Sequence, residues 1–282
     1  MMLVIAALFV WVFGWWLNIV LAKNPQIKFG LLLAPINFGI VLLIMWELLV
    51  RGLEVSPIIL PPPSAIASTF VERFDTIKID FVQTFVKGAL SGYLIGCSSA
   101  VLISIAIDKS PFLQNGLLPV GNFMAALPII GIAPILVMWF GFDWHSKAAV
   151  VVAMVFFPML VNTVQGLQAA SAMQRDLMHT YAAGYFHSLL KMRLPAAMPF
   201  IFNGLKTTTT LALIGAIVAE FFGSPIKGMG FRISTEVGRL ALDMVWAEIT
   251  VAAMAGSTFY GIVAMLEKMV TFWHPSQRER AG

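Results

Sequence analysis

Residues 173–199, MQRDLMHTYAAGYFHSLLKMRLPAAMP, form a polar, helix-patterned segment within the hydrophobic second half of the sequence. Apolar residues recur every four positions and define one helical face: Leu177, Tyr181, Tyr185 and Leu189. We expect Gly184 to divide the run into two short helices and Pro195 to end it, because proline lacks the N–H that continuation needs. The segment is too polar to cross a bilayer, yet it lies between two stretches that can. It is therefore expected to be a surface helix that another protein binds.

The composition around this segment is that of a membrane protein. Of 282 residues, 59% are hydrophobic and 11% are charged, whereas about a quarter of a soluble domain is charged. The net charge of +4 comes from cations scattered among loops, which excludes a nucleic-acid-binding face. The single cysteine, Cys97, excludes an internal disulfide. The predicted fold class is an all-α polytopic membrane protein.

Seven segments approach the roughly 20 apolar residues that a bilayer requires. They are 1–22, 30–50, 82–107, 116–140, 147–167, 197–222 and 246–271. The first carries no basic segment before it and no small-residue cleavage site, so we expect a retained span rather than a signal peptide. If 173–199 is cytoplasmic, the inside holds ten of the 18 Lys and Arg residues and only four of the 14 acids. The excess of inside cations favours that orientation.

The order of residues in 176–195 resembles the "EAA" loop of permease subunits of bacterial ATP-binding cassette importers. That loop reads Glu-Ala-Ala, three residues, Gly, nine residues, Ile-x-Leu-Pro. Its positions correspond here to Asp176, Leu177, Met178, Ala182, Met192, Leu194 and Pro195. Only the last two are identical, and the spacing is kept. Because Ala182 replaces glycine, we expect a less sharp turn there.

Further runs resemble the subfamily of permeases for nitrate, taurine, aliphatic sulfonates and bicarbonate. They are LPIIGIAPILVMWFG (127–141), Ser146-Lys147, FFPMLVNTVQGL (156–167), LPAAMPFIFNGLK (194–206), IVAEFFG (217–223) and Gly228-Met229-Gly230. This resemblance covers about 58–271. It implies a type I importer permease fold of about six core transmembrane helices, with an extra N-terminal helix. The implied organisation is that helix and a linker (1–29), a permease domain (30–275) with its coupling loop at 173–195, and a cytoplasmic tail (276–282).

The resemblance also implies partners and a location. They are two ATP-binding cassette ATPase subunits, a second permease (the same chain or a paralogue), an extracytoplasmic solute-binding protein and the lipid of a bacterial inner membrane. The sequence has no phosphate-binding GxxxxGK[ST] loop, so ATP would be bound by the partner and this chain needs no cofactor or metal of its own. The ATPase contacts would be Asp176, Leu177, Met178, Ala182, Gly184, Leu194 and Pro195.

Several polar or helix-breaking residues inside the apolar segments are candidates for a translocation path: Pro128, Pro134, Trp139, Asn203, Thr207, Thr210 and Glu220. Proline frees a carbonyl that needs a partner in protein or water, and an intramembrane carboxylate is costly unless it is paired or wet. Packing alone is the other explanation of the prolines. Glu220 also fits a gating or structural role, and hydroxyls can bond their own helix.

Three further expectations concern local structure. Gly88, Gly92 and Gly96 recur every four residues and favour close helix packing over substrate contact. Ser64, after three prolines, is expected to be the N-cap of a short helix at 65–75. Lys206 is expected to extend to the cytoplasmic interface.

Two other function classes compete with an importer permease. An ion-gradient-driven secondary transporter is the main alternative, although such proteins often carry buried ionisable pairs and internal repeats, neither of which is evident. A membrane-embedded enzyme lacks a convergent catalytic set. The substrate class stays open between a nitrate-, taurine- or sulfonate-like anion and a pyrimidine- or riboflavin-type vitamin precursor.

Overall fold

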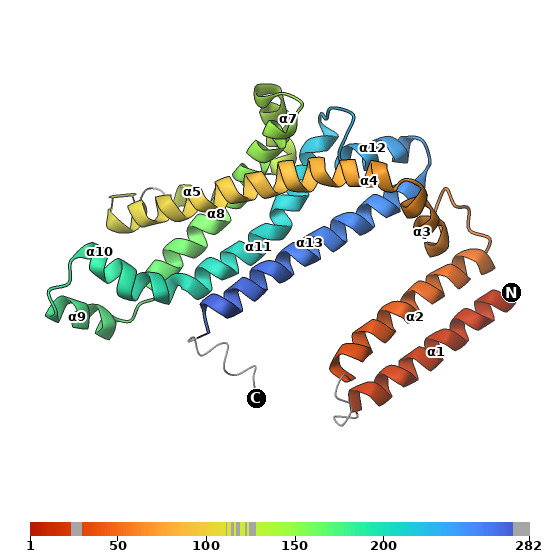
Figure 1. The fold of residues 1–282 in the computed structure, drawn as a ribbon, viewed down its shortest axis with the longest axis horizontal. Helices are drawn as coiled ribbons and strands as arrows, with labels where there is room; N and C mark the ends of the chain where they lie inside the picture. The colour runs from red at the N-terminus through yellow and green to blue at the C-terminus, as the bar shows by residue number, and fades with distance from the viewer. Residues whose placement is uncertain are drawn as a thin grey trace. The chain divides into compact units, whose positions relative to one another are not determined.

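The computed structural model describes residues 1–23, 30–110, 112–113, 116, 119–121, 123 and 128–272. Throughout these residues the regular structure is helical, as Figure 1 shows, which confirms the predicted all-α fold class. The tail expected at 276–282 lies outside the described residues.

The described residues form a series of helices along the chain. They are α1 (Met2–Lys23), α2 (Gly30–Gly52), α3 (Pro63–Glu72), α4 (Phe74–Phe81), α5 (Ser91–Lys109), α7 (Ile129–Phe140), α8 (Trp144–Gln168), α9 (Ala172–Thr180), α10 (Tyr185–Ser188), α11 (Leu194–Phe221), α12 (Met229–Gly238) and α13 (Leu242–Val270). Two π-helical stretches, η1 (Val82–Leu90) and η2 (Leu189–Arg193), join α4 to α5 and α10 to α11. Continuous helices therefore run over Phe74–Lys109 and Tyr185–Phe221.

Six helical segments in the described part of the chain are long and apolar enough to cross a membrane. They are Met2–Lys23, Leu33–Gly52, Phe74–Lys109, Trp144–Gln168, Tyr185–Phe221 and Leu242–Val270. The seventh expected span, 116–140, is represented by α7, which has 12 residues and is too short to cross alone. Pro128 precedes α7 and Pro134 lies inside it. Much of the preceding part of this span lies outside the described residues.

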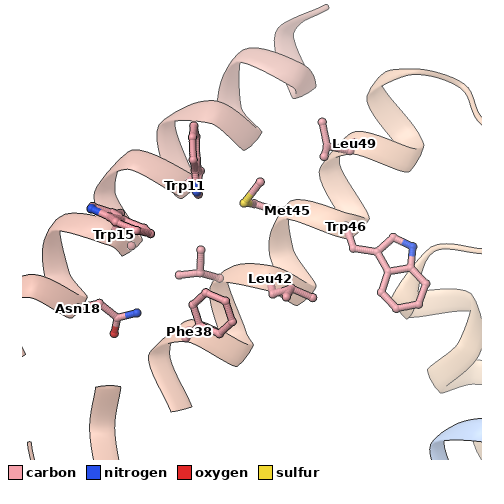
Figure 2. A pocket seen from close by; sticks show the side chains of 10 residues that line it. Trp11, Trp15, Asn18, Phe38, Leu42, Met45, Trp46 and Leu49 are labelled. Atoms are coloured by element: carbon pink, nitrogen blue, oxygen red, sulfur yellow. The ribbon is translucent and has the colours of Figure 1, made fainter. Parts of the chain in front are cut away.

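The chain divides into two compact units, and the first comprises Met1–Ile77 and Ile233–Ile249. Within it, α1 packs along α2. Gly14 permits close approach, since a Cβ there would lie 2.3 Å from a methyl carbon of Val41. The Asn37 side-chain amide donates to the Asn18 side-chain oxygen at 3.1 Å and to the Gly14 carbonyl at 3.2 Å. Beside this contact lies an open cavity of about 370 Å³, with Trp11, Trp15 and Phe38 among its walls (Figure 2).

The expected N-cap at Ser64 is wrong, because α3 begins one residue earlier. Pro63 occupies the first turn, where its missing N–H costs nothing, and Pro62 precedes it without a side-chain cap. The Ser64 N–H instead donates to the Glu47 carboxylate of α2 at 3.0 Å, and Arg51 Nε forms an ion pair with the same carboxylate at 2.5 Å. A carboxylate at a helix N-terminus is favourable, so α3 is capped from another helix.

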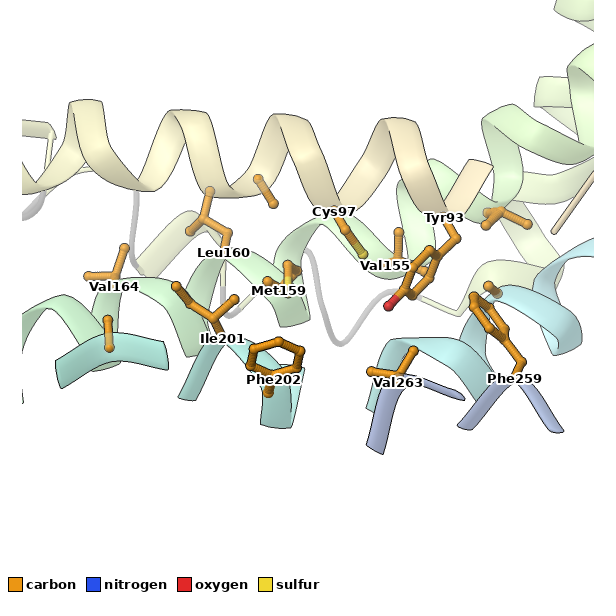
Figure 3. Close-up of a cluster of buried hydrophobic side chains, with 14 of the residues drawn as sticks. Tyr93, Cys97, Val155, Met159, Leu160, Val164, Ile201, Phe202, Phe259 and Val263 are labelled. Carbon is orange, nitrogen blue, oxygen red and sulfur yellow. The ribbon is translucent and has the colours of Figure 1, made fainter. Parts of the chain in front are cut away.

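The second unit comprises Lys78–Arg232 and Thr250–Gly282, and in it α8 packs against both α5 and α11. Figure 3 shows the buried side chains that fill this core. The Tyr93 ring lies edge-on to Phe259 of α13, with 4.8 Å between ring centroids, and the Tyr93 hydroxyl donates to the Leu205 carbonyl of α11. Because that hydroxyl has a partner, the aromatic ring is buried without an unpaired polar group.

The glycine row on η1 and α5 is a packing surface, as expected. A Cβ at Gly92 would lie 2.7 Å from the Ala148 carbonyl oxygen, and one at Gly96 would lie 2.5 Å from a methyl carbon of Val155. Both contacts are with α8, and the first involves backbone that cannot rotate away. These glycines therefore set the distance between α5 and α8.

Replacing Gly92 by alanine should destabilise the second unit by about 1–3 kcal/mol, the usual cost of overpacking. The matched control is Gly261→Ala in α13, where a Cβ meets nothing within 4 Å and alanine gains helix propensity of about 1 kcal/mol. Thermal unfolding of the purified chain in detergent measures the stability of both variants. Equal midpoints for the two variants would contradict the assignment of Gly92 to close packing.

Candidate coupling surface and pathway residues

A capping box starts α9. The Ser171 hydroxyl accepts the Gln174 N–H at 3.3 Å, and the Gln174 side chain accepts the Ser171 N–H at 3.0 Å. This reciprocal pair satisfies two N–H groups that a helix start leaves unpaired. The helix that carries Asp176, Leu177 and Met178 therefore begins at a fixed residue.

The turn after α9 is sharp, contrary to the expectation from alanine at position 182. Ala182 adopts φ +50°, the left-handed conformation that favours glycine, at a cost of about 1–2 kcal/mol. The Ala183 N–H donates to the Met178 carbonyl at 3.0 Å, which closes the turn. Gly184 follows in an extended conformation as the N-cap of α10, so the predicted division into two helices at this glycine is confirmed.

Pro195 does not end the helix, and that prediction is wrong. The chain continues without interruption from α10 through η2 into α11. In η2 the Leu194 N–H donates to the Leu189 carbonyl, five residues back, so the backbone changes register immediately before the proline. Pro195 then lies in the first turn of α11, where its missing N–H is tolerated.

Three side chains hold this segment to the neighbouring helices. Asp108 of α5 is buried; its Oδ1 accepts Arg193 Nη2 at 2.5 Å and its Oδ2 accepts the Tyr185 hydroxyl at 2.9 Å. Arg193 Nε also donates to the Leu167 carbonyl of α8 at 3.2 Å. The ends of α5, α8 and η2 and the start of α10 therefore meet at one group of hydrogen bonds. The bond between Arg193 and Asp108 is charge-assisted, and such bonds are stronger than neutral ones. Sequence reasoning missed this set.

The opposite side of the segment is exposed and apolar. The Leu177, Tyr181, Phe186 and Leu190 side chains are each more than half exposed, and Asp176, Ala182 and Gly184 are exposed with them. A groove of about 790 Å³ adjoins this surface, and Leu177, Met178, Lys191 and Pro195 are among its walls. We call the exposed residues 173–190 of α9, its turn, α10 and η2 the coupling surface. Large exposed apolar side chains rimmed by polar ones are typical of a protein-binding site.

The far end of α11 carries Glu220, whose carboxylate is almost completely buried. Thr84 Oγ1 donates to it at 2.8 Å and Gly230 N–H at 2.7 Å. Thr84 in turn accepts the Met229 N–H at 2.7 Å. Gly228 has φ +121°, and a Cβ there would lie 2.3 Å from the carboxylate, so only glycine fits. The loop after α11 wraps the carboxylate.

Asp80 and Lys147 extend this arrangement. Asp80 accepts the Gly228 N–H at 2.6 Å and Arg232 Nε at 2.8 Å, and Lys147 Nζ donates to the carbonyls of Phe142 and Gly223. Asp80, Lys147 and Glu220 are all buried. With Thr84, Arg232 and the backbone of 228–230 they form the Glu220 cluster, which balances two carboxylates against two cations. Buried charges are tolerated when they are paired, as Asp80 is with Arg232, or hydrogen-bonded, as Glu220 and Lys147 are.

At the start of α8, Asp143 is the N-cap and accepts the Trp144 N–H at 2.8 Å and the Gln83 side-chain amide at 3.2 Å. The Trp144 N–H, followed by the Gln83 amide, holds the pKa of Asp143 below its ordinary value. Asp143 is thus a capping residue for α8, which also carries Lys147.

The other candidate pathway residues are exposed, and the structure does not bring Glu220 to them. Asn203, Thr207 and Thr210 lie along one exposed stripe of α11, whereas Thr208 and Thr209 are buried. The Asn203 amide donates to Asn162 of α8 at 3.2 Å, and the Thr207 hydroxyl to the Asn203 carbonyl at 2.9 Å. On α7, Trp139 and Pro134 are exposed, as is Pro128 before it.

Lys206, on the same helix, has a partner that the sequence did not suggest. Its Nζ lies 2.7 Å from Glu267 Oε2 of α13, and both side chains are largely buried. Lys206 thus joins α11 to α13 through an ion pair.

Comparison with known proteins identifies the family. The profile described as "Binding-protein-dependent transport system inner membrane component" matches residues 92–272. The chain belongs to this family. A probable ABC transporter permease protein of Haemophilus influenzae is 30% identical over 81% of this chain and 93% of its own length. The formylaminopyrimidine transport permease protein ThiX of Halalkalibacterium halodurans is 26% identical (87% and 97%), and the putative aliphatic sulfonates permease SsuC of Bacillus subtilis is 27% identical (84% and 86%).

The family assignment agrees with the helices. It confirms the resemblance to type I importer permeases of the sulfonate, taurine and bicarbonate subfamily, and the six apolar segments of the described residues make the chain a multi-pass protein of the bacterial inner membrane. The matched range includes the whole coupling surface and most of the Glu220 cluster. The relatives are transport subunits.

Proposed function

We propose that this chain is the membrane-spanning subunit of an ATP-driven, binding-protein-dependent importer and that its coupling surface binds the ATPase. The observation that carries the proposal is an exposed apolar surface at 173–190, hydrogen-bonded through Tyr185 and Arg193 to α5 and α8. It follows the candidate span Trp144–Gln168 and includes the first turns of Tyr185–Phe221, which at 37 residues is longer than the roughly 20 that a bilayer requires. A soluble motor needs such a surface, because it cannot enter the bilayer. Two ATPase subunits, each on one permease of a pair, would move the two coupling surfaces together.

Transport also needs a path, and the stripe of Asn203, Thr207 and Thr210 supports one. These polar side chains are exposed on the single chain, in the middle of a helix long enough to span a membrane. Polar side chains are unfavourable against hydrocarbon. We therefore assign this stripe to a water-accessible path shared with a second permease, which is this chain or a paralogue.

The substrate belongs to the range of solutes that the relatives are named for. ThiX is named for formylaminopyrimidine and SsuC for aliphatic sulfonates. For this chain we propose a small polar solute, either a nitrate-, taurine- or sulfonate-like anion or a pyrimidine- or riboflavin-type vitamin precursor. An extracytoplasmic binding protein would deliver it.

Affinity purification of the tagged chain in mild detergent tests the proposal. We expect an ATP-hydrolysing subunit to co-purify, and deletion of 176–184 or the single change Leu177→Asp to release it. Ile226→Asp is the matched control, because Ile226 is an equally apolar and exposed residue on the loop after α11, away from the coupling surface. Loss of more than about 2 kcal/mol at a central apolar contact would reduce ATPase recovery more than tenfold.

The opposite result favours the gradient-driven alternative. If no ATPase accompanies the intact chain, or if Leu177→Asp retains as much as Ile226→Asp, the coupling surface does not bind a motor. If transport in proteoliposomes then responds to a proton or sodium gradient and not to ATP, the chain is a gradient-driven secondary transporter.

A further inference from the structure

The helix α5 is not next to the coupling surface in the chain. In the chain, α8 leads directly into α9, and α10 continues through η2 into α11, so a displacement of 173–193 reaches these two helices through the backbone. A displacement reaches α5 only through side chains. Among the described residues, hydrogen bonds between α5 and this segment run through Tyr185 and Arg193.

Asp108 receives both of these residues. It lies one residue before the end of α5, its side chain is 3% exposed, and each carboxylate oxygen accepts one hydrogen bond. The Tyr185 hydroxyl is also 3.2 Å from the Ile105 carbonyl, one turn earlier in α5. A buried carboxylate with two donors has a defined position, because losing either donor leaves it short of a partner.

Arg193 connects the same carboxylate to α8. Its Nε donates to the Leu167 carbonyl, one of the last carbonyls of α8, which have no partner within their own helix. A cation at a helix C-terminus is also favourable. Tyr185 and Arg193 lie at the two ends of the α10–η2 stretch, so both ends are bonded to Asp108.

We propose that Asp108, Tyr185 and Arg193 form a transmission clamp, three positioning residues that make α5 move with the coupling surface. The inference rests on the proposed function, since it assumes that an ATPase moves that surface. Without the clamp, α9 and α10 can shift relative to the end of α5, although α5 still packs along α8. The clamp thus converts a displacement of one loop into a displacement of the whole α5–α8–α11 group.

The test measures the distance between α5 and α9 in the complete complex with its co-purified ATPase. Spin labels are attached at Leu102→Cys of α5 and at Ala172→Cys, an exposed position of α9 just before the coupling surface, in a Cys97→Ser background, with labelled chain diluted by unlabelled chain. Distances are recorded without nucleotide and with ATP plus vanadate. Tyr185→Phe removes one hydroxyl from the clamp. Tyr260→Phe is the matched control, because Tyr260 is an exposed tyrosine of α13, outside both the clamp and the coupling surface.

With the clamp intact, and in Tyr260→Phe, the distance distribution should be the same in both nucleotide states. In Tyr185→Phe the distribution should shift or widen on trapping, because the segment can open locally, and ATP hydrolysis should continue. A merely structural role lowers the unfolding temperature but leaves the two nucleotide states alike, which overturns the clamp. If no ATPase is retained by the unsubstituted chain, the proposed function fails first, so the two failures are distinguishable.

Discussion

Replacing Glu220 by alanine should cost about 3–5 kcal/mol, because two buried donors lose their acceptor, at about 1–3 kcal/mol each, and buried side-chain volume is lost. The change removes the acceptor of the Thr84 hydroxyl and the Gly230 N–H. It also leaves Lys147 and Arg232 against a single carboxylate, Asp80. The loop after α11 loses its attachment, and a cavity replaces the carboxylate.

The measurement is thermal unfolding in detergent, where a loss of this size lowers the midpoint by about 10 °C for a domain of roughly this length. Glu72→Gln is the matched control, since Glu72 is exposed and should change the free energy of unfolding by less than about 0.5 kcal/mol. A midpoint for Glu220→Ala equal to that of the control would show that the carboxylate is not needed for folding. In that case Glu220 would act in another conformation of the transport cycle and not as a support of this one.

Hydropathy was sufficient to find the six long helices, because the bilayer requirement is local: about 20 consecutive apolar residues show it without any knowledge of the partner helix. The exception was 116–140. There the composition of a span is present, yet α7 begins only after Pro128 and is 12 residues long, with Pro134 inside it. Local composition measures apolar content, and it does not say where proline interrupts the hydrogen-bonded backbone.

Backbone details near Ala182 and Pro195 were predicted less well, for a related reason. Sequence rules assign each residue its preferred conformation. Ala182 is nevertheless held at φ +50° by the turn that α9 and α10 require, and the π-helical turn of η2 allows Pro195 inside a continuous helix. In both cases the surrounding structure outweighs a local preference of about 1–3 kcal/mol.

Of all these features, the charged clusters were the ones that the sequence predicted least well. Asp108 and Arg193 are 85 residues apart, and Asp80 and Arg232 are 152 apart; no pattern within one helix connects them. One signal was available: Asp80, Asp108, Lys147 and Glu220 are charges within or at the ends of apolar segments, where an ionised group requires a partner. That rule singled out Glu220 as a residue of interest, and it applied equally to the others. It does not say which carboxylate meets which cation.

A cysteine at Thr207 or Thr210 should react with a small, charged, water-soluble thiol reagent at least about tenfold faster than one at Ile40, because only the thiolate reacts and it forms in water, not in hydrocarbon. All three side chains lie on exposed faces near the middle of long helices. They differ in their surroundings on the helix: Thr207 follows Asn203 on a polar stripe, whereas Ile40 of α2 lies between the exposed side chains of Ile36 and Ile44.

The reaction is followed in membranes, with the Cys97→Ser chain as background, so that the introduced thiol is the only one in this chain. Adding ATP and vanadate should change the rates at 207 and 210 and leave the rate at 40 unchanged, since alternating access exposes a path from one side at a time. Equal and slow reaction at all three positions would place the stripe against lipid or in a dry contact between permeases. The hydroxyls would then serve only to bond their own helix, as Thr207 does with the carbonyl of Asn203.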